Sequence, residues 1–99
     1  MLLMNNKIKT GGFLNSLKER EKILSSYSDE YITSVVRNLY SSTSTYIIKD
    51  LLQELFMEDI SDRTIEKFLD VRDNISIDEF ISVYKETIGE NSLSFLLSF

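Results

Sequence analysis

The side chains that most often act as general bases and metal ligands are absent from this 99-residue chain, which contains no His and no Cys. Glu54, Glu58, Asp59 and Asp62 could supply a carboxylate pair, but such clusters are usually a solvated helix face. The sequence has no P-loop, no glycine-rich phosphate cradle and no Gly-flanked serine. We therefore expect no enzymatic activity, no metal site, no cofactor and no small-molecule substrate.

The segment from Phe68 to Phe80 has some likeness to a calcium-binding EF-hand loop. If Glu79 is the last loop residue, Phe68 is the first, Arg72 the fifth, and Asp73 stands where a glycine is normal. Calcium loops need oxygen ligands at the first and fifth positions and a sharp turn at the sixth. We therefore expect an ordinary connection between two helices here.

The formal charge of −5 is unevenly distributed along the chain. Residues 1–45 contain six basic and four acidic side chains, whereas residues 46–99 contain five and twelve. Because acidic surfaces repel phosphate, this argues against a DNA-reading helix over residues 62–69 or 77–88. Direct contact with DNA would depend on the basic side chains Lys7, Lys9, Lys18, Arg20, Lys22 and Arg37.

The length and the hydrophobic content of 42% are typical of one small globular domain. No apolar run approaches the roughly 20 residues of a membrane span. The apolar start, Met1–Met4, is too short for the core of a signal peptide. These features predict a cytoplasmic protein.

The spacing of apolar residues predicts an all-α fold, a small bundle of about five helices over residues 13–89. A loose leader is expected over residues 1–12, because the polar cluster and Gly11-Gly12 oppose regular structure. The expected helices run from Phe13 to about Leu24, Asp29 to Tyr40, Tyr46 to Phe56, Asp62 to Leu69 and Ile77 to Ile88.

Polar residues mark the expected helix ends. Ser28 is a suitable N-cap for the second helix, and Ser61 or Asp62 for the fourth. Ser76 and Glu79 have the spacing of a capping box, and Gly89 stands where a C′ glycine ends a helix.

Residues 90–99 form a separate interaction peptide in this interpretation, because five of the last seven residues are large and apolar. An exposed apolar peptide of this length can dock into a partner by burying two or three anchors, each contributing roughly 1.5–3 kcal/mol. Deleting Leu93–Phe99 is then expected to leave the helical body folded. In the alternative interpretation, the segment folds back onto the bundle.

The segment Leu93-Ser94-Phe95-Leu96-Leu97 resembles the sliding-clamp-binding peptides of phage T4-type replication and late-transcription proteins. Ser94 stands where those peptides usually carry an acidic residue, and Ser98-Phe99 extends the motif. The order of three further segments, Tyr46–Leu55, Glu66–Leu69 and Ile77–Ile81, is similar to the late-transcription coactivator of T4-type phages. The resemblance covers about the last 55 residues.

This resemblance implies a protein in the bacterial host cytoplasm that bridges the β-subunit flap of host RNA polymerase and the phage sliding clamp. It would act with a phage sigma-like factor and contact DNA only indirectly. The clamp-binding residues implied are Leu93, Phe95, Leu96, Leu97 and Phe99. The apolar residues Leu52, Leu55, Phe56 and Ile60 are proposed from their pattern as the polymerase contact, with plain core as the alternative.

Two other function classes stay open from the sequence. The chain has the size and acidity of a small helical inhibitor or immunity protein that blocks a partner enzyme. Such a protein would depend on acidic side chains such as Glu54, Glu58 and Asp62. A DNA-binding regulator would instead depend on the basic first half.

Overall fold

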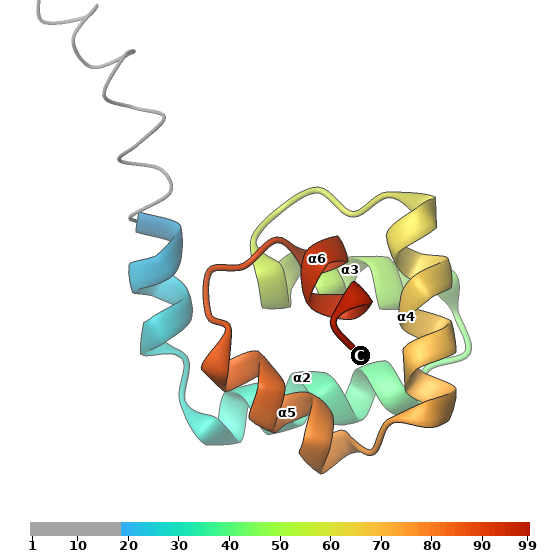
Figure 1. Cartoon of the computed structure of the whole chain (residues 1–99), viewed down its shortest axis with the longest axis horizontal. Helices are drawn as coiled ribbons and strands as arrows, with labels where there is room; N and C mark the ends of the chain where they lie inside the picture. Colours follow the sequence, from blue (N-terminus) through green and yellow to red (C-terminus); the bar gives the residue numbers. More distant parts are fainter. Residues whose placement is uncertain (1–18) are drawn as a thin grey trace, which may run out of the picture.

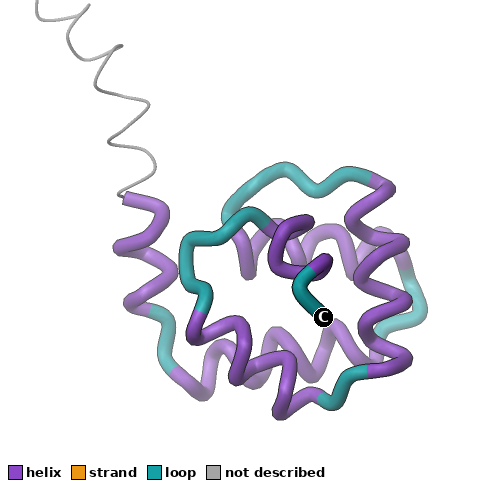
Figure 2. The backbone as a smooth tube through the Cα atoms, in the orientation of Figure 1, coloured by secondary structure: helices purple, strands orange, loops and turns teal. Residues whose placement is uncertain are grey.

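The computed structural model describes residues 19–99, and within them the chain is all-α, as the sequence predicts (Figures 1 and 2). The expected leader over residues 1–12 and the start of the first helix at Phe13 lie outside the described residues. A helical segment over residues 19–26 is followed by α2 (Asp29–Ser41), α3 (Thr45–Phe56), α4 (Asp62–Asn74), α5 (Ile77–Glu86) and α6 (Ser92–Leu97).

Short polar side chains begin each of these five labelled helices. Ser28, Ser44, Ser61 and Ser76 each accept a hydrogen bond from the backbone N–H three residues later, and Asn91 does the same for α6. These bonds satisfy amides that have no partner within the helix. The predicted N-caps Ser28, Ser61 and Ser76 are therefore confirmed.

The predicted ends of the helices that begin at Asp62 and Ile77 differ from the structure. The helix that begins at Asp62 continues past Leu69 to Asn74, because Val71 extends its buried face by another turn. The next helix stops at Glu86 and not at Ile88. Gly89 follows in a turn with φ +90°, a conformation that glycine adopts without steric cost.

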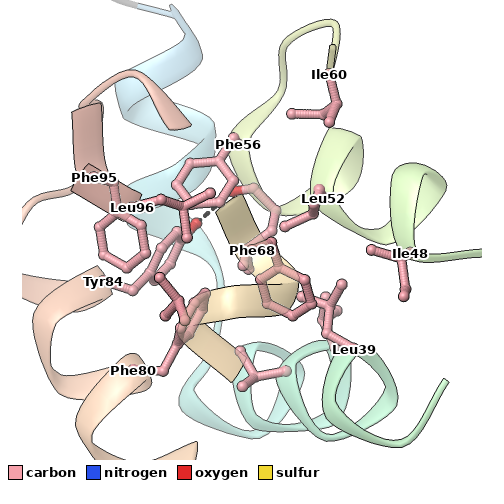
Figure 3. Close-up of a cluster of buried hydrophobic side chains, with 14 of the residues drawn as sticks. Leu39, Ile48, Leu52, Phe56, Ile60, Phe68, Phe80, Tyr84, Phe95 and Leu96 are labelled. Carbon is pink, nitrogen blue, oxygen red and sulfur yellow. Dashed lines mark hydrogen bonds between the residues drawn. The ribbon is translucent and has the colours of Figure 1, made fainter. Parts of the chain in front are cut away.

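The helices enclose one hydrophobic core (Figure 3). Helix α2 packs against α3 and α5, α3 packs against α4, and α4 packs against α6. The core therefore draws side chains from α2 through α6, and its largest fully buried members include Phe68, Phe80, Tyr84 and Phe95.

Polar side chains connect the helices at their ends. The Tyr84 hydroxyl donates to the Leu55 carbonyl at 2.6 Å, and the Tyr40 hydroxyl donates to the Ile75 carbonyl at 2.8 Å. Every buried side-chain nitrogen or oxygen in the described part of the chain has a hydrogen-bond partner. A stable core requires that its buried polar atoms form hydrogen bonds.

Among residues 19–99, none of the helices has the length and apolar character needed to cross a bilayer.

Candidate interaction site

The segment expected to be an exposed peptide forms helix α6 and packs into the core. Phe95 and Leu96 are fully buried, while Leu97 is 56% exposed. Leu93 and Phe99 are partly buried. The expectation of an exposed peptide is therefore wrong for Phe95 and Leu96, and the structure follows the alternative in which the segment folds back onto the bundle.

The ring of Phe95 lies in a cluster of aromatic side chains (Figure 3). Its centroid is 5.1 Å from Phe80, 5.3 Å from Phe56 and 6.2 Å from Tyr84. The ring of Phe99 stacks on Phe80 at 6.0 Å and meets Phe95 edge to face at 5.2 Å. Aromatic pairs in these arrangements contribute beyond their buried area. Deleting Leu93–Phe99 would therefore remove part of the core, contrary to the expectation that the body stays intact.

The two faces of α6 have different roles in this packing. Phe95 and Leu96 point into the core, whereas Leu93 and Leu97, four residues apart, lie along the outer side of the same short helix. The residues that match the clamp motif are thus divided between a buried pair and a more accessible pair. In this packed conformation, Leu97 offers the most exposed apolar side chain of the segment.

A polar network fixes the start of α6. The Arg20 guanidinium donates to the carbonyls of Phe56 at 2.8 Å, Gly89 at 2.7 Å and Glu90 at 3.2 Å. One carboxylate oxygen of Glu58 accepts from the backbone N–H of Ser92 at 2.6 Å. The other lies 3.7 Å from the Arg20 guanidinium. No local signal in the sequence indicates these long-range partners of Arg20.

The residues proposed from their pattern as the polymerase contact are all buried. Leu52 and Leu55 are fully inaccessible, and Phe56 and Ile60 are nearly so. They belong to the hydrophobic core together with α2 and α5. A partner protein cannot reach them in this conformation, so an exposed contact made by these four residues is excluded, and the plain-core alternative holds.

Exposed apolar side chains occur instead at the first turn of α3. Tyr46 is 80% exposed and its neighbour Ile47 is 51% exposed. Tyr46 borders a groove of about 510 Å³ between α3 and the start of α4, whose lining also includes Lys49, Asp62 and Ile65. The helical spacing of apolar residues does not distinguish Tyr46 and Ile47 from the buried side chains of α3.

The acidic side chains considered for an inhibitory surface are partly engaged within the protein. Glu54 accepts a hydrogen bond from the Tyr31 hydroxyl, and burial together with Glu54 raises the pKa of Tyr31 to about 12. Glu58 binds Arg20 and the Ser92 amide. Asp62 is exposed at the start of α4. Two of the three carboxylates therefore have structural partners.

Two basic side chains, Arg72 of α4 and Lys85 of α5, also have internal partners. Arg72 donates to the carbonyls of Leu39 at 3.0 Å and Ser42 at 2.6 Å. Lys85 pairs with Asp29 at 2.8 Å. The ion pair of Lys85 engages a cationic group of the candidate over residues 77–88, whereas Arg72 lies beyond the candidate over residues 62–69.

The EF-hand-like segment is helical over most of its length, since α4 continues to Asn74 and only Ile75 and Ser76 connect it to α5. A calcium loop would need an irregular backbone there to direct its ligands inward. Within residues 19–99, no group of three or more His, Cys, Asp or Glu residues has an arrangement suited to a metal ion.

Comparison of the chain with known protein families, with curated proteins and with solved structures gave no match.

Proposed function

We propose that this protein is a non-enzymatic bridging protein of the phage late-transcription coactivator type. Its helical body binds the β-subunit flap of host RNA polymerase, and its C-terminal segment binds the phage sliding clamp beside a sigma-like factor. The observation that carries the proposal is the segment Leu93–Leu97, whose anchors match the clamp motif and which forms its own capped helix after the turn at Gly89.

The clamp contact begins at the outer side of α6 in this proposal. Leu97 is available in the packed state, and burying its remaining exposed surface contributes roughly 1–1.5 kcal/mol. That alone gives weak binding. Full engagement requires Phe95 and Leu96 to leave the core of this protein and enter an apolar pocket on the clamp. Most of their surface area is then buried again in the complex.

The polymerase contact is best placed at Tyr46 and Ile47, because the four residues first considered are buried. Exposed aromatic side chains are frequent anchors of protein interfaces. The groove beside Tyr46, whose lining residues are mostly polar, offers adjacent space for a side chain of the partner. The two contacts then lie on different helices, α3 for the polymerase and α6 for the clamp.

The test measures binding of the purified full chain to a T4-type sliding clamp and, separately, to the polymerase β flap. Leu97→Asp is expected to weaken clamp binding at least tenfold and to leave flap binding unchanged. The double variant Tyr46→Ala with Ile47→Ala is expected to show the reverse pattern. Both changes affect exposed side chains, so the unfolding midpoint serves as a check that the fold is intact.

Two outcomes would contradict the proposal. The first is the absence of binding to either protein at concentrations of about 100 μM, well above the micromolar affinity expected for two or three anchors. The second is clamp binding that is insensitive to Leu97→Asp but lost in Asp62→Lys. That result would favour an acidic recognition surface, as in an inhibitor, over the apolar segment.

A further inference from the structure

We infer that Arg20 and Glu58 form a latch that keeps α6 on the body, and that opening this latch gives a partner access to Phe95 and Leu96. The identity of that partner, a sliding clamp, rests on the proposed function. The latch itself rests on the contacts of four segments that meet at the start of α6: residues 19–26, the end of α3, the loop before α4 and the turn around Gly89.

Arg20 supplies one half of the latch. Its three donor nitrogens each reach a different carbonyl, one at the end of α3 on Phe56 and two in the turn before α6, on Gly89 and Glu90. The arginine side chain is only 13% exposed, so these charge-assisted hydrogen bonds are partly shielded from water. Arg20 thus connects the turn that leads into α6 to helix α3.

Glu58 supplies the other half. One carboxylate oxygen accepts from the Ser92 amide at 2.6 Å, and Ser92 is itself a buried residue. The second oxygen lies 3.7 Å from Arg20, so the two side chains support each other. Separating α6 from the body would break the Ser92 bond and leave both charges with fewer partners, which opposes opening.

Helix α6 depends on such contacts more than the other helices do. It contains six residues, and isolated helices of this length do not persist in water. It is joined to α5 through the turn at Gly89, so rotation about that turn can withdraw Phe95 and Leu96 from the core without unwinding another helix. Opening of this segment also exposes the apolar surface that Phe95 and Leu96 cover, so the latch contacts add to the cost of opening and do not supply it alone.

The function of the latch follows from which side chains it covers. Phe95 and Leu96 match anchor positions of the clamp motif, yet both are inaccessible while α6 is packed. A partner that binds the open form must offset the cost of opening, so its apparent affinity is reduced by the fraction of open molecules. A weaker latch therefore raises that affinity, provided that the open segment is the form that binds.

The test compares Arg20→Gln, Glu58→Gln and Glu58→Ala in the full chain with the wild type. The matched control is Lys85→Gln, which removes an ion pair between α5 and α2 and leaves the contacts of α6 in place. Hydrogen exchange at the α6 amides is expected to be about tenfold faster in the latch variants, while the amide of Leu52 in α3 changes little. Binding to a purified T4-type clamp is expected to tighten severalfold in the same variants.

The failure of the latch and the failure of the proposed function give different results. Unchanged α6 exchange in both the Arg20 and the Glu58 variants overturns the latch, whatever the clamp binding is. Faster α6 exchange without clamp binding in any variant overturns the proposed partner but retains the latch. Faster exchange combined with weaker clamp binding shows that the clamp prefers packed α6, which overturns the inference that opening promotes docking.

Discussion

The ring of Phe95 meets the ring of Phe80 nearly edge to face, with the two centroids 5.1 Å apart and an interplanar angle of 80°. This contact joins α6 to α5 and makes the C-terminal segment part of the hydrophobic core. The same segment carries the residues that we propose for docking. Substitutions there must therefore be chosen so that loss of stability and loss of binding can be distinguished.

Replacing Phe95 by Ala is expected to lower the free energy of unfolding by about 3–5 kcal/mol, because the change leaves a cavity among Phe56, Phe80 and Tyr84. Leu97→Ala is the matched control, since Leu97 is exposed on the same helix and its truncation should change stability by only about 0.5 kcal/mol. Urea unfolding followed by circular dichroism measures both effects. Equal effects of the two variants would contradict the packing of α6.

Gly89→Ala is expected to destabilise the protein by two separate mechanisms. The residue has φ +90°, where a side chain costs roughly 1–2 kcal/mol, and a Cβ atom there would lie 2.7 Å from the Cγ of Glu21. Combining the change with Glu21→Ala should recover the stability that is lost through the close contact. The loss that is due to the positive φ should remain. Thermal unfolding of the two single variants and the double variant separates these contributions.

Arg72→Met is expected to lower the free energy of unfolding by about 1–3 kcal/mol, because it leaves the carbonyls of Leu39 and Ser42 without their donor. Arg72→Lys should lower the free energy of unfolding by less, since an ammonium group retains a donor and a positive charge near the ring of Phe68. Arg63→Met, at an exposed position of the same helix, is the control. A similar loss in the Arg63 and Arg72 variants would show that charge alone, and not the carbonyl contacts, is responsible.

The features that the sequence predicted correctly are those with local causes. Ser28, Ser61 and Ser76 begin helices because a serine hydroxyl reaches an amide three residues later, a relationship visible in the sequence. The helical spacing of apolar residues likewise predicted helix α3, although Tyr46 and Ile47 in its first turn are exposed. These local rules were sufficient for the all-α class and for most helix boundaries.

The features that were missed depend on contacts between distant positions. Arg20 and Gly89 are 69 positions apart, and nothing near either residue indicates that a guanidinium will bind that carbonyl. The packing of Phe95 on Phe80 depends on space left by the other helices, which periodicity does not describe. The terminal segment was therefore recognised as apolar, but the sequence could not decide between burial in the core and exposure to a partner.

Burial of tyrosine hydroxyls predicts that the protein loses stability in alkaline solution. Burial raises the pKa of Tyr84 well above its usual value of 10.0, against a smaller opposing effect of Arg20. Burial also raises the pKa of Tyr40 to about 12. A raised folded-state pKa means that the folded protein holds the proton more tightly than the unfolded chain does. The stability that these protonated tyrosines contribute is fully present below pH 10 and is lost as the pH rises from 10 towards the folded-state pKa.

Replacing Tyr84 by Phe should therefore weaken the decline of stability above pH 10, because the variant has no phenol to ionise at that buried position. At neutral pH the same variant is expected to be about 1–2 kcal/mol less stable, since the Leu55 carbonyl loses the hydroxyl that donates to it at 2.6 Å. Tyr46→Phe, at a ring that is 80% exposed, is the control. Urea unfolding at pH 8, 10 and 11 tests the prediction, and an equally steep alkaline decline in Tyr84→Phe and the wild type would show that ionisation of Tyr84 does not limit stability.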